Sequence, residues 1–197
     1  IASGGFLHRT LVRYIGMHTL MSDEELFALV RDTNDEQAFR SLFKRYDKRL
    51  YAYCLRALGS HDEAQDMFQT ISLTVYDKRQ SFSDGSFAAW LFTIARNFCL
   101  KAIRNRKHTT EYSDEMMPPE ERERHSSDFM LKQALHNAIA QLPEEFREAL
   151  EMKYFDDLPY EDIAKALGIT VSLAKVRVFR AKKMIQENLS TIINELR

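Results

Sequence analysis

Positively charged side chains gather in two segments of the sequence that contain no acidic residue. Residues 96–107 and residues 170–186 each carry five Lys or Arg side chains, so each segment has a net charge of +5. Such clusters can neutralise the phosphate groups of a nucleic-acid backbone. The whole chain of 197 residues has a net charge of −1. The distribution of charge, rather than its total, therefore points to a nucleic-acid partner.

Residues suited to catalysis or metal binding show no comparable pattern. The six histidines have no metal-ligand spacing, and no glycine-rich phosphate loop occurs. Cys54 and Cys99 each lie inside an amphipathic segment, which is typical of reduced core thiols in the cytoplasm. We therefore expect no metal, no cofactor and no enzyme activity. An enzyme built on a helical scaffold is the function class with the least support.

The elements that must position the basic clusters are helices. Apolar residues recur every three or four positions, glycine and proline are scarce, and no strand pattern of useful length appears. Capping patterns predict helix starts at Ser22 and Ser60, and Gly59 is expected to end the helix between them. No run of about eighteen apolar residues occurs, so we expect no direct membrane insertion. The sequence predicts an all-α protein.

The helical pattern falls into two blocks with an acidic stretch between them. Residues 22–107 predict an aromatic-rich helical domain, and residues 129–197 predict a second helical domain. Residues 108–128 have a net charge of −5 and no helical period, which indicates a flexible acidic linker. Residues 1–21 are expected to be an N-terminal arm, or a cloning vestige, of which residues 1–16 lie outside the fold.

The strongest local pattern covers residues 159–183. A short helix over 160–167 is followed by a turn at Gly168 and by a basic helix from Val171, which is the spacing of a helix-turn-helix. A preceding helix from Pro143 is expected to turn Tyr154 inward. Apolar positions 174, 178, 181 and 185 share the packing face of the basic helix. The chemistry of the opposite face suits DNA phosphates and base edges, although a solvated helix of an ordinary bundle has the same pattern. This outward face carries Ser172, Lys175, Val176, Phe179, Arg180 and Lys183.

Two weaker patterns lie in the first block. The helix over 62–78 has a polar, acidic outward face, which is also typical of a plain solvated surface. Residues 79–86 form a turn around Asp84-Gly85, and the basic segment follows it along the chain. Aromatic side chains beside a cationic groove bind unstacked bases, although the aromatic residues near this turn also fit a buried core: Phe82, Phe87 and Trp90.

The chain resembles regions 2 and 4 of the sigma-70 family in three segments: DEAQDMFQ, then SFSDGSFAAWLFTIARN, then LPEEFREALEMKYFDDLPYEDIAKALGITVSLAKVRVFRAKK. The resemblance spans residues 22–188. No further domain lies between the two regions, which is typical of the extracytoplasmic function (ECF, group IV) class. The resemblance implies a factor that binds core RNA polymerase and directs transcription initiation at promoter DNA by recognising its −10 and −35 elements.

The resemblance also assigns roles to individual residues. Contact with the β′ clamp helices of the polymerase falls to Glu63, Asp66 and Gln69. The outward face of the helix-turn-helix, as listed above, is implied to recognise the −35 element. The same domain is implied to contact the β flap of the polymerase. Recognition and melting of the −10 element fall to Phe82, Ser83, Asp84, Ser86, Arg96, Asn97, Lys101, Arg104 and Arg106.

The family resemblance implies one more partner and a location. Factors of this class are often held by an anti-sigma factor, so we expect such a partner, and a cytoplasmic protein that is held at the membrane only through it. A different class of function remains open. A helical sensor domain over residues 22–107, joined to a helix-turn-helix, would bind a duplex operator as a dimer without polymerase.

Overall fold

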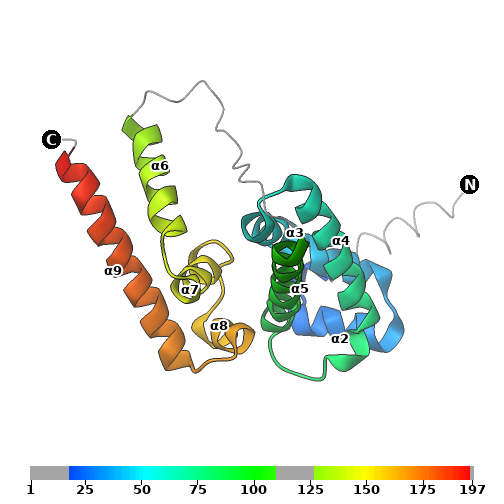
Figure 1. Cartoon of the computed structure of the whole chain (residues 1–197). Helices are drawn as coiled ribbons and strands as arrows, with labels where there is room; N and C mark the ends of the chain where they lie inside the picture. The colour runs from blue at the N-terminus through cyan, green and yellow to red at the C-terminus, as the bar shows by residue number, and fades with distance from the viewer. Residues whose placement is uncertain (1–17, 110–126, 196–197) are drawn as a thin grey trace, which may run out of the picture. The chain divides into compact units, whose positions relative to one another are not determined.

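The computed structural model describes residues 18–109 and 127–195, and the regular elements in these two ranges are all helices (Figure 1). The expected all-α fold is therefore confirmed. The chain divides into two compact units, Ile1–Arg104 and Asn105–Arg197, which we describe separately. Of the predicted linker, residues 110–126 lie outside the described residues, and its two ends belong to helices.

The first unit is a helical bundle whose helix boundaries follow the predicted caps. The Ser22 hydroxyl accepts a hydrogen bond from the backbone N–H of Glu25 at 3.1 Å, and the Glu25 carboxylate accepts one from the Ser22 N–H at 2.7 Å. Gly59 ends α3 (Glu36–Leu58) with a φ of 74°, in the left-handed region that suits glycine. The described elements of the unit are α2 (Asp23–Thr33), α3 (Glu36–Leu58), α4 (His61–Asp77), the 3₁₀ helix η1 (Arg79–Ser81) and α5 (Phe87–Thr109).

An aromatic cluster fills part of the core of the first unit. Phe27 of α2 is fully buried, and its ring centroid lies 5.3 Å from that of Phe82, 4.7 Å from that of Phe87 and 5.3 Å from that of Trp90. Aromatic pairs at such separations contribute beyond the area that they bury. The cluster therefore ties α2 to α5 and to the segment that precedes α5.

The two cysteines also belong to this core. Cys54 of α3 and Cys99 of α5 are free and buried, as expected for core thiols. The contact with Cys99 and the burial of the thiol raise the pKa of Cys54 far above its ordinary value. Cys54 is therefore held as a neutral thiol rather than as a reactive thiolate.

The folded part of the first unit begins earlier than the sequence indicates. His18 is buried, and the Arg45 guanidinium of α3 donates hydrogen bonds to the backbone carbonyls of His18 and Met21 at 2.8 and 2.9 Å. Residues 18–21, which the sequence assigns to the N-terminal arm, are therefore held by α3. An arginine that binds backbone carbonyls leaves no pattern in the sequence. Residues 1–17 lie outside the described residues.

The second unit contains the predicted helix-turn-helix. The helix α8 covers the predicted residues 160–167, and Gly168 ends it with a φ of 66°. On α9 the four apolar positions predicted to pack, Ala174, Val178, Ala181 and Ile185, are all buried, as predicted. The described helices of the unit are α6 (Ser127–Ala140), α7 (Glu144–Tyr154), α8 (Tyr160–Leu167) and α9 (Val171–Glu195).

One residue expected in the core of the second unit lies on its surface. Tyr154 is 55% exposed, so the expectation that it faces inward is wrong. Tyr154 is the last residue of α7, and the chain turns just after it, where Asp157 has a φ of 49°. The ring lies against the Nζ of Lys182, 5.8 Å from its centroid. The turn, rather than the helical period, sets the direction of this side chain.

Candidate nucleic-acid and protein interfaces

The outward face of α9 is a surface of mixed cationic and apolar side chains. Phe179 is 69% exposed and Val176 is 39% exposed, although both are apolar. The polar members of the predicted face are exposed as well: Ser172, Lys175, Arg180 and Lys183. All six residues predicted for this face therefore point away from the core. A helix with such a face has the size and chemistry to enter a DNA major groove.

Contacts with α7 and α8 fix this face in place. Arg177 is the one basic residue of the segment 170–186 that turns inward, and it pairs with Glu145 of α7 at 2.9 Å. The Lys175 Nζ lies 5.7 Å from the ring centroid of Tyr160 at the start of α8. At the N-terminus of α9, the Thr170 hydroxyl accepts a hydrogen bond from the Leu173 N–H at 3.2 Å. The exposed side chains of α9 therefore stand on a rigid element.

A second candidate surface follows the loop over residues 79–86 into α5. After the buried Phe82, the loop exposes Ser83 and Asp84, and Ser86 is half-buried. Phe82 follows the buried-core alternative rather than the role that the resemblance implies, because its ring is only 6% exposed and lies 5.4 Å from that of Trp90. The ring cannot stack on a base while it stays in this cluster. On α5, Arg96 is half-buried, and four predicted residues are exposed: Asn97, Lys101, Arg104 and Arg106.

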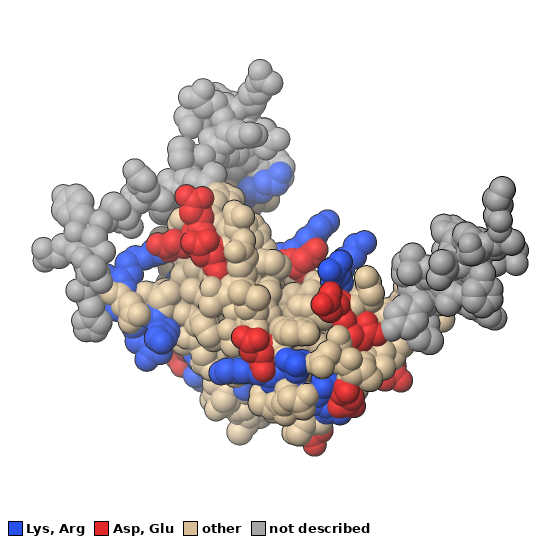
Figure 2. All heavy atoms as spheres, turned by 90° about the vertical axis from the view of Figure 1, so that its right-hand side faces the viewer, with Lys and Arg blue, Asp and Glu red and all other residues tan. Residues whose placement is uncertain are grey.

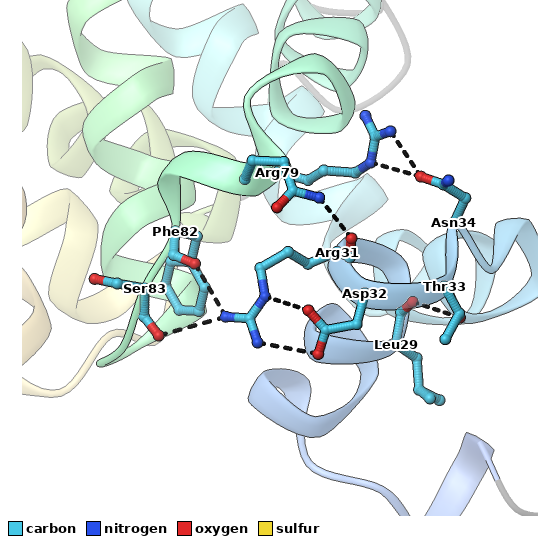
Figure 3. Close-up of polar contacts among 9 residues, drawn as sticks. Leu29, Arg31, Asp32, Thr33, Asn34, Arg79, Phe82 and Ser83 are labelled. Carbon is cyan, nitrogen blue, oxygen red and sulfur yellow. Dashed lines mark hydrogen bonds and ion pairs between the residues drawn. The ribbon is translucent and has the colours of Figure 1, made fainter.

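Residues that the sequence does not single out hold this loop (Figure 3). From α2, the Arg31 guanidinium donates to the carbonyls of Phe82 and Ser83 at 3.2 and 3.5 Å. In the other direction, the Arg79 guanidinium donates twice to the Asn34 Oδ1, at 3.0 and 2.6 Å. The partners are about fifty positions apart in the sequence, and no local spacing relates them.

Arg31 is itself held by its neighbour Asp32. The Nε and one terminal nitrogen of the guanidinium donate to the two carboxylate oxygens of Asp32, at 2.7 and 3.1 Å. The hydrogen bond from Asp32 and the negative charge of its carboxylate raise the pKa of Arg31, and the same hydrogen bond lowers the pKa of Asp32. Both groups therefore stay charged over the whole physiological pH range.

A third candidate surface lies on α4. Glu63, Asp66 and Gln69 are all exposed and follow one another at intervals of three residues, which places them along one side of the helix. Leu73 continues this side one turn further and is 67% exposed. Leu73 is not among the residues that the sequence predicts for this surface, and an apolar side chain within a polar surface is compatible with a protein interface. The surface thus joins acidic and apolar character.

On the face drawn in Figure 2, basic and acidic side chains are interspersed, so charge alone does not single out a surface on that face. Within the described residues, no cluster of His, Cys, Asp and Glu is placed to hold a metal ion. Among the described helices we find none that combines the length and the apolar character needed to cross a membrane. The arrangement of individual side chains on α4, α5 and α9 therefore carries the functional argument.

Each of the two units matches the model of a known protein family. Residues 42–109 match the model of sigma-70 region 2, and residues 132–185 match the model of sigma-70 region 4. The chain is 29% identical over 195 residues to the RNA polymerase sigma-H factor of Pseudomonas aeruginosa, covering 91% of this chain and all of that protein. It is 28% identical over 170 residues to the ECF RNA polymerase sigma factor RpoE of Cereibacter sphaeroides, covering 84% of this chain and 93% of that protein.

Solved structures agree with these matches. The sigma factor RpoE of Bartonella quintana, in complex with the anti-sigma factor NepR, is 28% identical with a TM-score of 0.58, and the match covers 77% of this chain and 98% of that one. CnrH, solved with the cytosolic domain of CnrY, shares the fold with a TM-score of 0.65 at 19% identity, over 86% of this chain and 97% of that one. The chain belongs to the sigma-70 family, and within it to the ECF class of transcription initiation factors.

Proposed function

We propose that the three surfaces divide the work of promoter recognition among them. The α4 surface binds core RNA polymerase, the loop with α5 reads and opens the −10 element, and α9 reads the −35 element. The observation that carries this proposal is the face of α9, where Phe179 and Val176 stay exposed beside cationic side chains on a helix-turn-helix of a sigma-70 region 4. A structural role for these two residues would bury them.

The α4 surface suits the clamp helices of the β′ subunit. Glu63, Asp66 and Gln69 offer acidic and amide groups to a basic partner, and Leu73 offers an apolar contact beside them. Protein interfaces commonly place apolar anchors within a polar rim. The region 4 unit would in turn meet the β flap, as the family resemblance implies.

The two DNA elements need different chemistry. A duplex −35 element presents base edges in its major groove, where Arg180 suits guanine and the apolar Val176 and Phe179 suit thymine methyl groups. The melted −10 element is single-stranded and meets the exposed loop tip at Ser83 and Asp84. The phosphates on either side meet the basic residues of α5: Arg96, Lys101, Arg104 and Arg106.

The protein would carry no catalysis of its own, because the polymerase forms the phosphodiester bond. Its place of work is then the cytoplasm, where the polymerase and the chromosome are. An anti-sigma factor is the expected regulatory partner, since the similar Bartonella quintana protein was solved with one. Through that partner the protein would be held at the membrane without inserting into it.

A charge reversal on α4 tests the proposal. The variant Asp66→Lys, alone or with Gln69→Ala, is expected to weaken binding to core polymerase by about tenfold or more, because it opposes the charge of the partner surface. The stability should change by less than about 0.5 kcal/mol, since the position is exposed. Glu36→Lys is the matched control, an exposed acidic residue on α3 rather than on the α4 surface.

The measurement is co-purification with core polymerase, followed by run-off transcription. The wild type should start transcription at one discrete site, and Asp66→Lys should not, while Glu36→Lys behaves like the wild type. Wild-type affinity for core polymerase in Asp66→Lys would show that this surface does not bind it.

A further inference from the structure

The exposed tip of the loop before α5 is short and is bounded on both sides by anchored residues. Ser83, Asp84 and Gly85 are exposed, whereas Phe82 before them is buried and Ser86 after them is half-buried. Gly85 has a φ of 93°, a backbone conformation that residues other than glycine rarely adopt. Three residues between two fixed ends have few conformations available. The shape of the tip therefore depends on what fixes its ends.

Helix α2 fixes the end that comes first along the chain. One terminal nitrogen of Arg31 donates to the carbonyl oxygens of Phe82 and Ser83, while the other two donor nitrogens bind Asp32. The fork between Arg31 and Asp32 sets the plane of the guanidinium, and that plane leaves one nitrogen pointing at the loop (Figure 3). Gln80 adds a hydrogen bond from its side-chain amide to the Arg31 carbonyl at 2.7 Å.

Helix α2 also fixes the end that comes second. The Glu24 carboxylate accepts a hydrogen bond from the backbone N–H of Phe87 at 3.0 Å, at the N-terminus of α5. The Ser86 hydroxyl accepts another from the Ala89 N–H at 3.2 Å. Both boundaries of the tip thus receive a charged side chain from the same helix. The loop is thus held in its conformation from both sides by side chains of α2.

We propose that Arg31, oriented by Asp32, is a positioning residue for −10 recognition, because it fixes the carbonyls at which the reading tip begins. The inference rests on the proposed function of this loop. A tip that already has its bound conformation does not need to be ordered when a single-stranded base arrives, so more of the contact energy appears as affinity for the correct base. Loss of the anchor should therefore reduce discrimination between sequences without weakening the contact with polymerase.

A competing role for Arg31 is direct contact with a DNA phosphate. The two roles predict opposite effects for Asp32. If Arg31 bound a phosphate, Asp32→Ala would remove a repelling charge and strengthen binding to any DNA. If Asp32 orients Arg31 toward the loop, Asp32→Ala lowers sequence discrimination, as a change of Arg31 does. Arg31→Lys separates the roles again, because lysine keeps the charge but lacks the planar fork.

The first arm of the test needs no DNA. Trp90 is the only tryptophan of the chain, and its ring lies 5.4 Å from that of Phe82. In the free, full-length protein, Arg31→Lys and Asp32→Ala should both make Trp90 more accessible to acrylamide quenching, with helical content unchanged. The matched control is Arg40→Lys on α3, where the arginine is 70% exposed and pairs only with Glu36 among the ion pairs described, at 3.6 Å. Unchanged quenching in both α2 variants would overturn the proposal.

The second arm uses the holoenzyme and a single-stranded oligonucleotide. Its sequence is the −10 region upstream of the start site mapped with the wild-type holoenzyme, and a scrambled oligonucleotide of equal length is the comparison. Arg31→Lys and Asp32→Ala should lower the ratio of the two affinities by about tenfold at unchanged affinity for core polymerase. Arg40→Lys should keep the wild-type ratio.

The outcomes separate this inference from the function that it builds on. No preference for the −10 oligonucleotide in the wild-type holoenzyme would overturn the proposed function itself. If Arg31→Lys retains the wild-type preference, only the positioning role is overturned. The same holds if Asp32→Ala binds both oligonucleotides more tightly than the wild type does. A loss of preference in both variants, with Trp90 more accessible, would establish it.

Discussion

The two proposed DNA-reading surfaces are built in different ways. On α9 the reading side chains stand on one continuous helix, so the hydrogen bonds of that helix fix their directions. In the first unit the proposed reading tip is a loop of three exposed residues, and Arg31 and Glu24 of α2 form hydrogen bonds with the residues on either side of it. On the proposed −35 surface the directions of the side chains are thus set within one helix, whereas the residues that hold the proposed −10 loop lie far away in the sequence.

This difference has a physical meaning for the two tasks. A duplex has a regular groove, and a rigid helix matches it without adjustment. A base that leaves the duplex must be met by a surface whose shape is irregular, which a helix face cannot supply. A loop can supply it, provided that other elements hold it still. We therefore expect changes in the supporting core to affect −10 recognition, and changes on the exposed helix face to affect −35 recognition.

The largest expected effect is on the core under the loop. Phe27→Ala removes a fully buried ring that contacts Phe82, Phe87 and Trp90. We expect the first unit to lose about 3–5 kcal/mol of unfolding free energy. Urea unfolding, monitored by Trp90 fluorescence, measures the unfolding free energy of this unit. Met152→Ala, in the core of the second unit, is the control, and it should leave the Trp90 transition in place. A Trp90 transition that moves equally in both variants would contradict the separation into two units.

The next effect concerns base discrimination by α9. Arg180→Ala should lose about 1–3 kcal/mol of discrimination between the −35 element and a mutated one, because it removes a contact with a base edge. Lys182→Ala, two positions along, should instead weaken binding to all sequences. It should also reduce the slope of the logarithm of affinity against the logarithm of salt concentration by about one. Binding of holoenzyme to both fragments over a range of salt concentrations measures the two effects. Equal behaviour of the two variants would show that α9 does not read bases through Arg180.

The smallest effect concerns the start of α2. Tyr46 is buried, and its hydroxyl donates a hydrogen bond to the Asp23 carboxylate, which also pairs with Arg45 at 2.6 Å. Burial, and then the hydrogen bond to Asp23, raise the pKa of Tyr46 above its ordinary value. The folded state therefore favours the neutral phenol. An unfolded tyrosine ionises near about pH 10, so this stabilisation is complete below that pH and falls above it.

The variant Tyr46→Phe tests this pH dependence. Below about pH 10 we expect it to cost about 1.5 kcal/mol of the stability of the first unit, through the lost hydrogen bond. Above that pH the difference between the variant and the wild type should shrink. Urea unfolding followed by Trp90 fluorescence at several pH values gives the difference. A constant difference across the range would mean that the hydroxyl of Tyr46 contributes nothing that titrates.

The comparison also explains what the sequence could predict. The helix-turn-helix was predicted to the residue for α8, and the two faces of α9 were assigned correctly, because helical periodicity carries both. The ring of Tyr154 was assigned wrongly, since it lies at the last position of α7, where a turn replaces the helical period. The roles of the exposed residues in polymerase and DNA binding stay predictions.

The loop shows the opposite case. The sequence located its turn chemistry and left open whether Phe82 is buried, but it could not reveal that Arg31 and Arg79 bind across about fifty positions. Phe27 was not identified as core, although it contacts three other rings of the cluster. Such contacts follow from the way in which α2 packs against the segment before α5. No spacing rule within one helix reports a partner on another.

We expect the two proposed DNA-reading surfaces to act together only when polymerase holds them. The most direct test is a mobility-shift titration of one promoter fragment at physiological salt, with and without core RNA polymerase. We expect weak binding by the protein alone, because two separate units pay the full cost of orientation, and tight, sequence-specific binding with core polymerase. Tight binding of the protein alone, as a dimer on a palindromic site, would contradict the account and identify a polymerase-independent regulator.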